Sequence, residues 1–163
     1  MTVALFGGDS RNGQLEKGAH ADTIILASIH HDTKEVRLAS VYRDTLTQQV
    51  SGKIQKANYA YFAGGPKDAI NMLNKNFDLD IQDYVTVDFK ALADVVDLLG
   101  GIELEVTDQE AKEINNYIDE TGTVTGKKAT HLTNGGTLKL DGVQAVTYAR
   151  IRKNAGGDYK RAE

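Results

Sequence analysis

The order of local patterns constrains this chain most, because short apolar runs typical of strands alternate with longer segments of helical spacing. The predicted strands are 2–6, 23–29, 36–41, 84–87 and 102–106. The predicted helices are 71–77, 90–99, 107–118 and 142–150. Strands that alternate with helices predict an α/β (α+β) sandwich in which helices flank one central mixed sheet.

Turn signals place the boundaries of several of these elements. The polar segment 30–35 predicts a turn that joins the second and third strands into a hairpin. Pro66 follows two glycines and predicts a turn that enters a helix. Asp141 precedes the last predicted helix and is a suitable N-cap. The segment 121–136 is rich in glycine and threonine and predicts a loop.

Two apolar helix faces are predicted to form most of the helical part of the core. The first comprises Ile70, Leu73 and Phe77. The second comprises Leu92, Val95, Val96 and Leu99, which recur at helical spacing before a glycine pair. Some of these side chains are also candidates to line a ligand groove.

Composition excludes several classes of function. The chain has 163 residues, the length of one ordinary domain, and 40% of them are hydrophobic. Its formal net charge of -4 argues against a nucleic-acid-binding protein. The absence of cysteine excludes disulfides, thiolate metal sites and a cysteine nucleophile. No apolar run is long enough to span a membrane.

Charged residues gather where the predicted strands begin and end. Asp9 and Arg11 follow the first strand, Asp22 precedes the second, and Arg43 and Asp44 follow the third. Two acids close together suit Mg²⁺, which binds one or two carboxylates together with water and phosphate oxygens. Arginine holds phosphate oxygens in a bidentate manner. The alternative interpretation is that the aspartates are caps or turn residues.

The C-terminal segment is the most basic part of this acidic chain. Arg150, Arg152 and Arg161 lie there together with Lys153 and Lys160. Such a cluster is either an anion site or a solvated basic face at the C-terminus of a helix, where cations are favoured. Arg150 and Arg152 converge on one ligand only if the backbone between them is extended or irregular.

A series of short motifs runs in order along nearly the whole chain: Gly8-Asp9-Ser10-Arg11, Ala21-Asp22-Thr23, Tyr42-Arg43-Asp44-Thr45, Lys53-Ile54, Ala57-Asn58-Tyr59-Ala60-Tyr61, Gly64-Gly65, Leu98-Leu99-Gly100-Gly101-Ile102, Leu140-Asp141-Gly142-Val143-Gln144-Ala145, Tyr148-Ala149-Arg150-Ile151-Arg152, Gly157-Asp158 and Arg161. As an ordered set, these motifs resemble those of the LytR-CpsA-Psr family.

The resemblance implies a phosphotransferase outside the bacterial cell membrane. Such an enzyme moves a glycopolymer (wall teichoic acid, capsular polysaccharide or a similar polymer) from a polyprenyl-pyrophosphate carrier to peptidoglycan through a phosphodiester bond. An apolar groove holds the polyprenyl chain, and the pyrophosphate lies at its mouth. The resemblance further implies that residues 1–163 form a single domain, truncated at its C-terminus and lacking the N-terminal membrane anchor.

The same resemblance implies roles for individual residues. Asp9 and Asp22 match acids associated with Mg²⁺ (or Mn²⁺). Positions that bind the pyrophosphate or serve the transfer are matched by Arg11, Arg43, Arg150, Arg152 and Arg161. The candidate catalytic residues are Arg43, Asp44 and Arg150. Asp44 is either the general base or the residue that fixes Arg43.

Three positions depart from the family pattern. His20 stands where arginine is usual, so the phosphate contact of that arginine is left to a side chain without a permanent charge. Tyr42 stands where proline is common. The family continues past Arg161 into an Arg-Gln pair that contributes to the site, and this chain ends at Glu163.

Two other functions are compatible with the same residues. A polyprenyl-pyrophosphate hydrolase would pass the phosphoryl group to water, and a non-catalytic regulatory module (an attenuator) would bind the lipid pyrophosphate without turnover. The net charge and the lack of a helix-turn-helix pattern argue against direct DNA binding.

Overall fold

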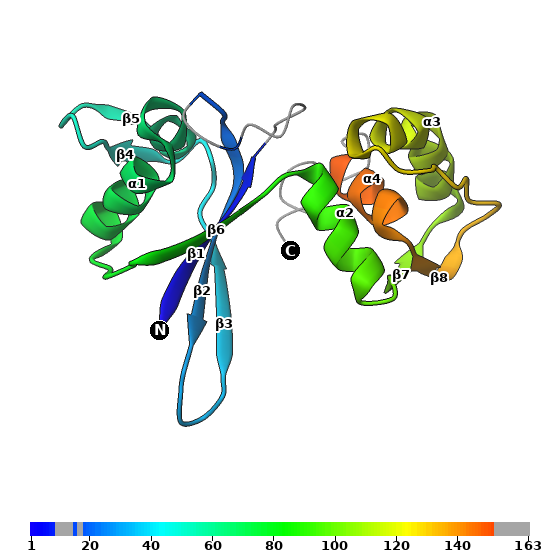
Figure 1. The fold of residues 1–163 in the computed structure, drawn as a ribbon, viewed down its shortest axis with the longest axis horizontal. Coiled ribbons are helices and arrows are strands. Elements are labelled where there is room, and N and C mark those ends of the chain that lie inside the picture. Colours follow the sequence, from blue (N-terminus) through cyan, green and yellow to red (C-terminus); the bar gives the residue numbers. More distant parts are fainter. Residues whose placement is uncertain (9–14, 16–17, 152–163) are drawn as a thin grey trace. The chain divides into compact units, whose positions relative to one another are not determined.

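The chain forms two compact units, Met1–Asp88 and Phe89–Glu163, and each is described by itself. The computed structural model describes residues 1–8, 15 and 18–151 (Figure 1). The motif Gly157-Asp158 lies outside these residues.

The first unit is built on a four-stranded mixed sheet, which confirms the predicted fold class. The sheet comprises β1 (Thr2–Gly8), β2 (Ala21–Ile29), β3 (Val36–Ser40) and β6 (Asp83–Val87), in the order β3-β2-β1-β6. β2 runs antiparallel to both β1 and β3, and β6 runs parallel to β1. The predicted hairpin between β2 and β3 is therefore present.

One long helix and a small hairpin lie between β3 and β6 in the sequence. The hairpin pairs β4 (Leu46–Gln48) with β5 (Ile54–Lys56), and α1 (Ala57–Phe77) follows at once. The prediction that a helix begins near Pro66 was only half right. Pro66 starts the second half, after a kink at Gly65 with φ 70° and ψ −160°. The first half was missed because Lys56 gives no capping signal.

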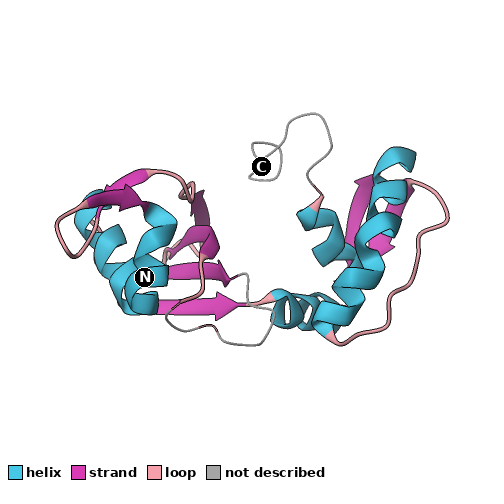
Figure 2. Ribbon diagram, turned by 90° about the horizontal axis from the view of Figure 1, so that it is seen from above, coloured by secondary structure: helices cyan, strands magenta, loops and turns pink. Residues whose placement is uncertain are grey.

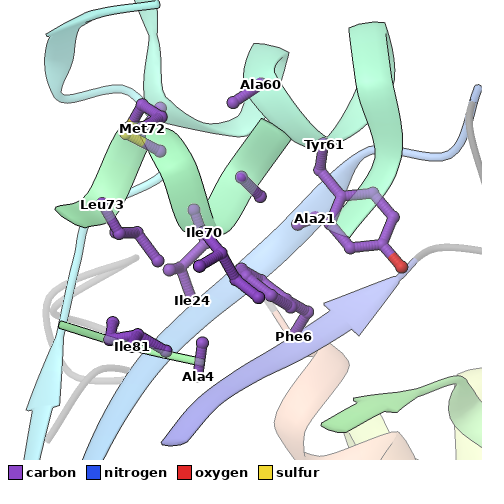
Figure 3. Close-up of a cluster of buried hydrophobic side chains, with 12 residues drawn as sticks. Ala4, Phe6, Ala21, Ile24, Ala60, Tyr61, Ile70, Met72, Leu73 and Ile81 are labelled. Carbon is purple, nitrogen blue, oxygen red and sulfur yellow. The ribbon is translucent and has the colours of Figure 1, made fainter. Parts of the chain in front are cut away.

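The core of this unit lies between α1 and one face of the sheet (Figure 3). The ring of Phe6 on β1 meets the ring of Tyr61 on α1 edge-on, with centroids 5.2 Å apart. Ile70 and Leu73 are buried as predicted, but the prediction for Phe77 was wrong, since its side chain is exposed at the end of α1.

The described part of the second unit contains three helices and a two-stranded sheet (Figure 2). Its elements are α2 (Phe89–Leu98), β7 (Ile102–Val106), α3 (Asp108–Thr125), β8 (Gly136–Leu140) and α4 (Gly142–Arg150). Asp141 caps α4 as predicted, and Gln144 completes a capping box with it. The loop predicted over 121–136 was partly wrong, because α3 continues to Thr125 before a C-cap at Gly126.

The predicted apolar face of α2 was right for Val96 and wrong for its other three residues. Leu92, Val95 and Leu99 are exposed, whereas Ala93 and Val96 are buried. The reason is the close approach of α4, since a Cβ atom on Gly142 would lie 2.1 Å from the carbonyl oxygen of Ala93. Such an approach needs small residues on both helices. The prediction instead favoured the larger apolar residues Leu92, Val95 and Leu99, which lie outside this contact.

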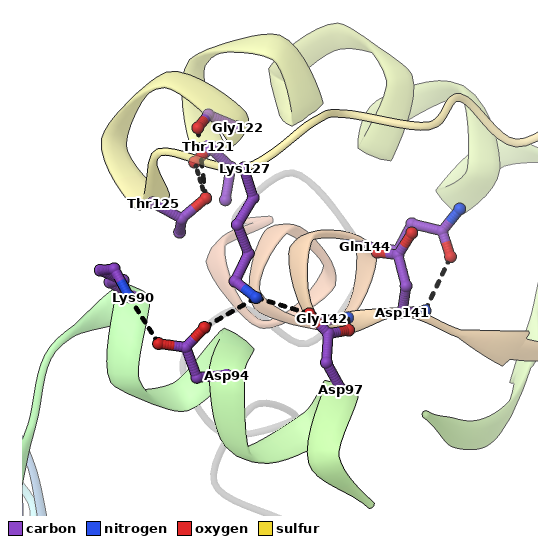
Figure 4. Close-up of polar contacts among 10 residues, drawn as sticks. All are labelled: Lys90, Asp94, Asp97, Thr121, Gly122, Thr125, Lys127, Asp141, Gly142 and Gln144. Atoms are coloured by element: carbon purple, nitrogen blue, oxygen red, sulfur yellow. Dashed lines mark hydrogen bonds and ion pairs between the residues drawn. The ribbon is translucent and has the colours of Figure 1, made fainter. Parts of the chain in front are cut away.

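Polar contacts also join the helices of the second unit (Figure 4). The ammonium group of Lys127 lies 2.7 Å from carboxylate oxygens of both Asp94 and Asp97 on α2. Asp97 also accepts a hydrogen bond of 2.7 Å from the backbone amide of Gly142 at the start of α4. Hydrogen bonding to Lys127 lowers the pKa of both carboxyl groups, so they stay ionised at neutral pH.

Truncation of the buried Phe6 side chain should destabilise the first unit strongly. Phe6→Ala should reduce the free energy of unfolding by about 3–5 kcal/mol, because it removes a buried ring and leaves a cavity against Tyr61. Urea unfolding followed by circular dichroism measures this. Leu38→Ala on β3 is the control, since Leu38 is 67% exposed, and equal losses in the two variants would contradict the core assignment.

Candidate anion-binding site

The first unit contains a pocket of about 500 Å³ where β2 and α1 begin. It is lined by Gly18, Ala19, His20, Asp22, Arg43, Gln55, Lys56, Asn58 and Tyr59. Two of the predicted site residues, Asp22 and Arg43, therefore meet in one pocket. Lys56, Asn58 and Tyr59 belong to it as well, and the sequence analysis assigned no site role to any of them.

The charged side chains at this pocket form a chain of ion pairs. Arg43 donates a hydrogen bond from Nη1 to Asp22 Oδ1, and its Nε lies 3.8 Å from Asp44 Oδ2. Asp44 Oδ1 in turn lies 2.6 Å from Lys56 Nζ. All four side chains are more than a third exposed, so solvent screens the pairs and a charged ligand can reach them.

The start of α1 fixes the segment that carries Arg43 and Asp44. The amide of Ala57 donates to the carbonyl oxygen of Thr45 at 2.8 Å, and the amide of Asn58 donates to that of Arg43 at 3.1 Å. These carbonyl groups replace the side-chain cap that Lys56 does not supply. The backbone of the Arg-Asp-Thr segment is therefore held against the helix N-terminus.

Positive groups gather at this corner together with the carboxylates of Asp22 and Asp44. The first turn of α1 contains no acidic residue, so the positive end of the helix dipole is not offset within the helix. Arg43 and Lys56 add two cations, and each is aligned by a carboxylate. A phosphate group can bind to guanidinium and ammonium donors of this kind.

His20 occupies the rim where the family pattern has arginine. Its ring stacks on Phe62 with centroids 4.6 Å apart and planes 10° apart. The amide of Gly18 donates to the carbonyl oxygen of Phe62 at 3.1 Å, which ties this end of the loop to α1. The imidazole therefore lines the pocket as a flat group held against a second ring.

Asp44 is held by its cationic neighbours. Its hydrogen bond to Lys56, with the charges of Lys56 and Arg43, lowers the pKa of the carboxyl group. A lowered pKa makes a carboxylate a weaker base. Of the two roles left open by the sequence, the geometry favours the one in which Asp44 fixes Arg43, and it adds Lys56 as a second partner.

Arg150 lies in the second unit, at the C-terminal end of α4. Its guanidinium stands over the ring of Phe89, 4.9 Å from the centroid. It donates to Thr121 Oγ1 at 2.9 Å and to Glu120 Oε1 at 3.1 Å. The helix ends there, and Ile151 is extended with φ −65° and ψ 131°.

The remaining predicted site residues, Asp9, Arg11, Arg152 and Arg161, lie outside the described residues. Among the residues that are described, no three acidic or histidine side chains gather as metal ligands. None of the described helices combines the length and the apolar character needed to cross a bilayer.

A domain with a mixed sheet and a pocket lined by ion-paired cations beside a helix N-terminus fits the family suggested by the sequence motifs. A model of the LytR_cpsA_psr family matches residues 1–163. The chain therefore belongs to the LytR_cpsA_psr family.

Similar proteins support this assignment. The polyisoprenyl-teichoic acid--peptidoglycan teichoic acid transferase TagU of Bacillus licheniformis is 32% identical over 99% of this chain and 47% of its own length. Among solved structures, "TagT bound to LI-WTA" has a TM-score of 0.77 at 27% identity, covering 99% of this chain and 58% of that one. TagT with bound octaprenyl pyrophosphate lipid has a TM-score of 0.74 at 25% identity, covering 99% and 59%. The chain thus spans about half the length of the curated relative.

Removal of the Lys56 charge should change the titration of Asp44. In Lys56→Met the pKa of Asp44 should rise toward its ordinary value, because the carboxylate loses its hydrogen-bonded cation. The lowered wild-type pKa means that this pair stabilises the fold above the ordinary carboxyl pKa and ceases to do so as the pH falls through the folded-state pKa.

Carbon-13 NMR titration of the Asp44 carboxyl measures this shift. Lys53→Met on the same hairpin is the matched control and should leave the Asp44 curve unchanged. Identical Asp44 curves in wild type and Lys56→Met would contradict the ion-pair chain.

Proposed function

We propose that this chain belongs to the catalytic domain of a transferase that moves a glycopolymer phosphate from a polyprenyl-pyrophosphate carrier to peptidoglycan. The proposal rests on one observation above all: Arg43, paired with Asp22 and Asp44, lines a pocket beside the N-terminus of α1, whose first turn contains no acidic residue. Membership of the family and the names of the similar transferases support the same function. Wall teichoic acid is the polymer those names favour, and capsular polysaccharide belongs to the same proposal.

In the proposed reaction, a sugar hydroxyl of peptidoglycan attacks the phosphorus that carries the glycopolymer. A new phosphorus–oxygen bond forms, the bond to the bridging oxygen of the pyrophosphate breaks, and polyprenyl phosphate leaves with that electron pair. The proton of the attacking hydroxyl passes to solvent water. Arg43 and Lys56 bind the pyrophosphate oxygens and stabilise the charge that gathers on the leaving phosphate. Asp44 holds both cations in place. Arg11, Arg150, Arg152 and Arg161 belong to the proposal as further pyrophosphate ligands.

Mg²⁺, or Mn²⁺, fits the donors that face the pocket. Asp22 supplies one carboxylate there, and Mg²⁺ commonly binds one or two carboxylates together with phosphate oxygens. Asp22, together with Asp9, would hold the ion. The ion would offset charge on the pyrophosphate, and Arg43 would keep the Asp22 carboxylate oriented toward it.

The surroundings of the reaction belong to the same proposal. The polyprenyl chain would occupy an apolar groove, and the full-length protein would be anchored by a helix to the cell membrane with this domain on the extracytoplasmic face. Peptidoglycan is the acceptor in this scheme.

The transfer assay uses a synthetic polyprenyl-pyrophosphate glycan, Mg²⁺ and a peptidoglycan oligomer, with mass spectrometry to detect the phosphodiester product. Arg43→Ala should lower the rate by about 10²-fold or more, because a preorganised cation at the leaving group is lost. Asp22→Ala should lower it too, and this loss should lessen at high Mg²⁺ concentration. Arg37→Ala is the matched control, because Arg37 is an exposed arginine of the same sheet that pairs with Glu35.

The same assay separates the alternative functions. Release of free polymer without an acceptor would replace the transferase with a hydrolase. Tight binding of the lipid without transfer or hydrolysis would leave only a binding module. Equal rates for Arg43→Ala and Arg37→Ala would remove the pocket from the reaction.

A further inference from the structure

The hairpin of β4 and β5 presents an apolar face to solvent. Leu46 is 71% exposed, Ile54 is 60% exposed, and Val50 in the turn between them is 53% exposed. Single exposed aliphatic residues are common on soluble proteins. Three exposed aliphatic residues on one short hairpin form a larger apolar surface if they share one face.

The strand register places the two exposed strand residues on the outer face. Leu46 pairs with Lys56, and Gln48 pairs with Ile54, so these four side chains share one face. On the opposite face, Thr47 is buried at 3% exposure, whereas its partner Gln55 is exposed and lines the pocket. The side chain of Gln49 is buried too and donates to the carbonyl oxygens of Gln55 and Lys56, which braces the hairpin from inside.

The hairpin is also fixed to the body of its unit. Asn76, near the end of α1, accepts from the amide of Gln48 and donates to its carbonyl oxygen, both at 2.9 Å. The turn closes through a hydrogen bond of 2.8 Å from the amide of Gln49 to the carbonyl oxygen of Lys53. The hairpin is thus fixed to α1 at Gln48 and closed at its turn, so its outer face is preformed. We call this face, which comprises Leu46, Gln48, Ile54 and Lys56, the platform.

The segment that carries this platform contains lysines and no acidic residue. The segment from Thr45 to Lys67 contains Lys53, Lys56 and Lys67 and no acidic residue, although the whole chain has 23 acidic and 19 basic residues. Lys56 pairs with Asp44, which precedes the segment, and Lys53 is exposed beside the turn. Aliphatic side chains flanked by lysines match a surface with an apolar interior and anionic head groups.

We propose that the β4–β5 hairpin is a membrane-contacting element. Leu46, Val50 and Ile54 enter the head-group region of an anionic bilayer, and Lys53 contacts lipid phosphates. Ile54 lies two residues before Lys56, which lines the pocket, so the bilayer surface comes next to the pocket mouth. This contact does not depend on the transfer reaction, and its failure would leave the proposed function intact.

The chain has no tryptophan, so a single introduced tryptophan reports on its own surroundings without background. Val50→Trp and Ile54→Trp should show emission shifted to shorter wavelength when vesicles of equal parts phosphatidylglycerol and phosphatidylcholine are added. Leu38→Trp on β3, with a similarly exposed parent residue, is the control and should not shift. Circular dichroism confirms that each variant is folded.

Vesicle sedimentation measures the binding itself. Lys53→Glu should weaken it by about fivefold or more, since each lysine near an anionic surface contributes about that factor. Leu46→Asp with Ile54→Asp should weaken it further, and added salt should act in the same direction.

Two results would overturn the proposal. One is an unchanged emission of both hairpin tryptophans with vesicles, or an equal shift at position 38. The other is a shift without vesicles that grows with protein concentration, which would assign the hairpin to contact with a second copy of the chain.

Discussion

The hydrogen bonds at the start of α1 are the interaction on which the candidate site depends. A helix leaves its first amides without partners, and here the carbonyl groups of Arg43 and Thr45 accept from two of them. The same two bonds fix the backbone from which Arg43 reaches Asp22 and Asp44 reaches Lys56. The backbone that caps the helix therefore also carries Arg43 and Asp44, so a change in the cap would move both side chains.

The same helix also carries the other functional features of the first unit. Its buried face packs Tyr61 against Phe6 and so sets its height above the sheet. Its second half holds the hairpin through Asn76, on the side where Leu46 and Ile54 face outward. The pocket and the proposed membrane-contacting hairpin are thus held by the same helix. This arrangement suits a site that binds the charged head group of a lipid-linked ligand.

The sequence predicted those parts that are determined by local chemistry. The Asp141 cap, the β2–β3 hairpin and the position of Asp22 and Arg43 at strand ends all follow from nearby residues, and the structure contains them. The start of α1 was missed because its cap consists of backbone carbonyl groups twelve or more residues away, which no side-chain pattern reveals. The buried face of α2 was misjudged because a close helix approach selected Ala93 over the larger Leu92. Lys56 was missed because its place in the pocket lining and its contact with Asp44 depend on the folded chain.

The central claim is that the Arg43 pocket binds a lipid pyrophosphate. Isothermal titration calorimetry with geranylgeranyl pyrophosphate and Mg²⁺ tests it without requiring turnover. We expect wild type and Arg37→Ala to bind with the same affinity, and Arg43→Ala to bind at least about tenfold more weakly, because it loses a charge-assisted contact. Equal affinity in all three proteins would contradict the claim and would place the pyrophosphate elsewhere.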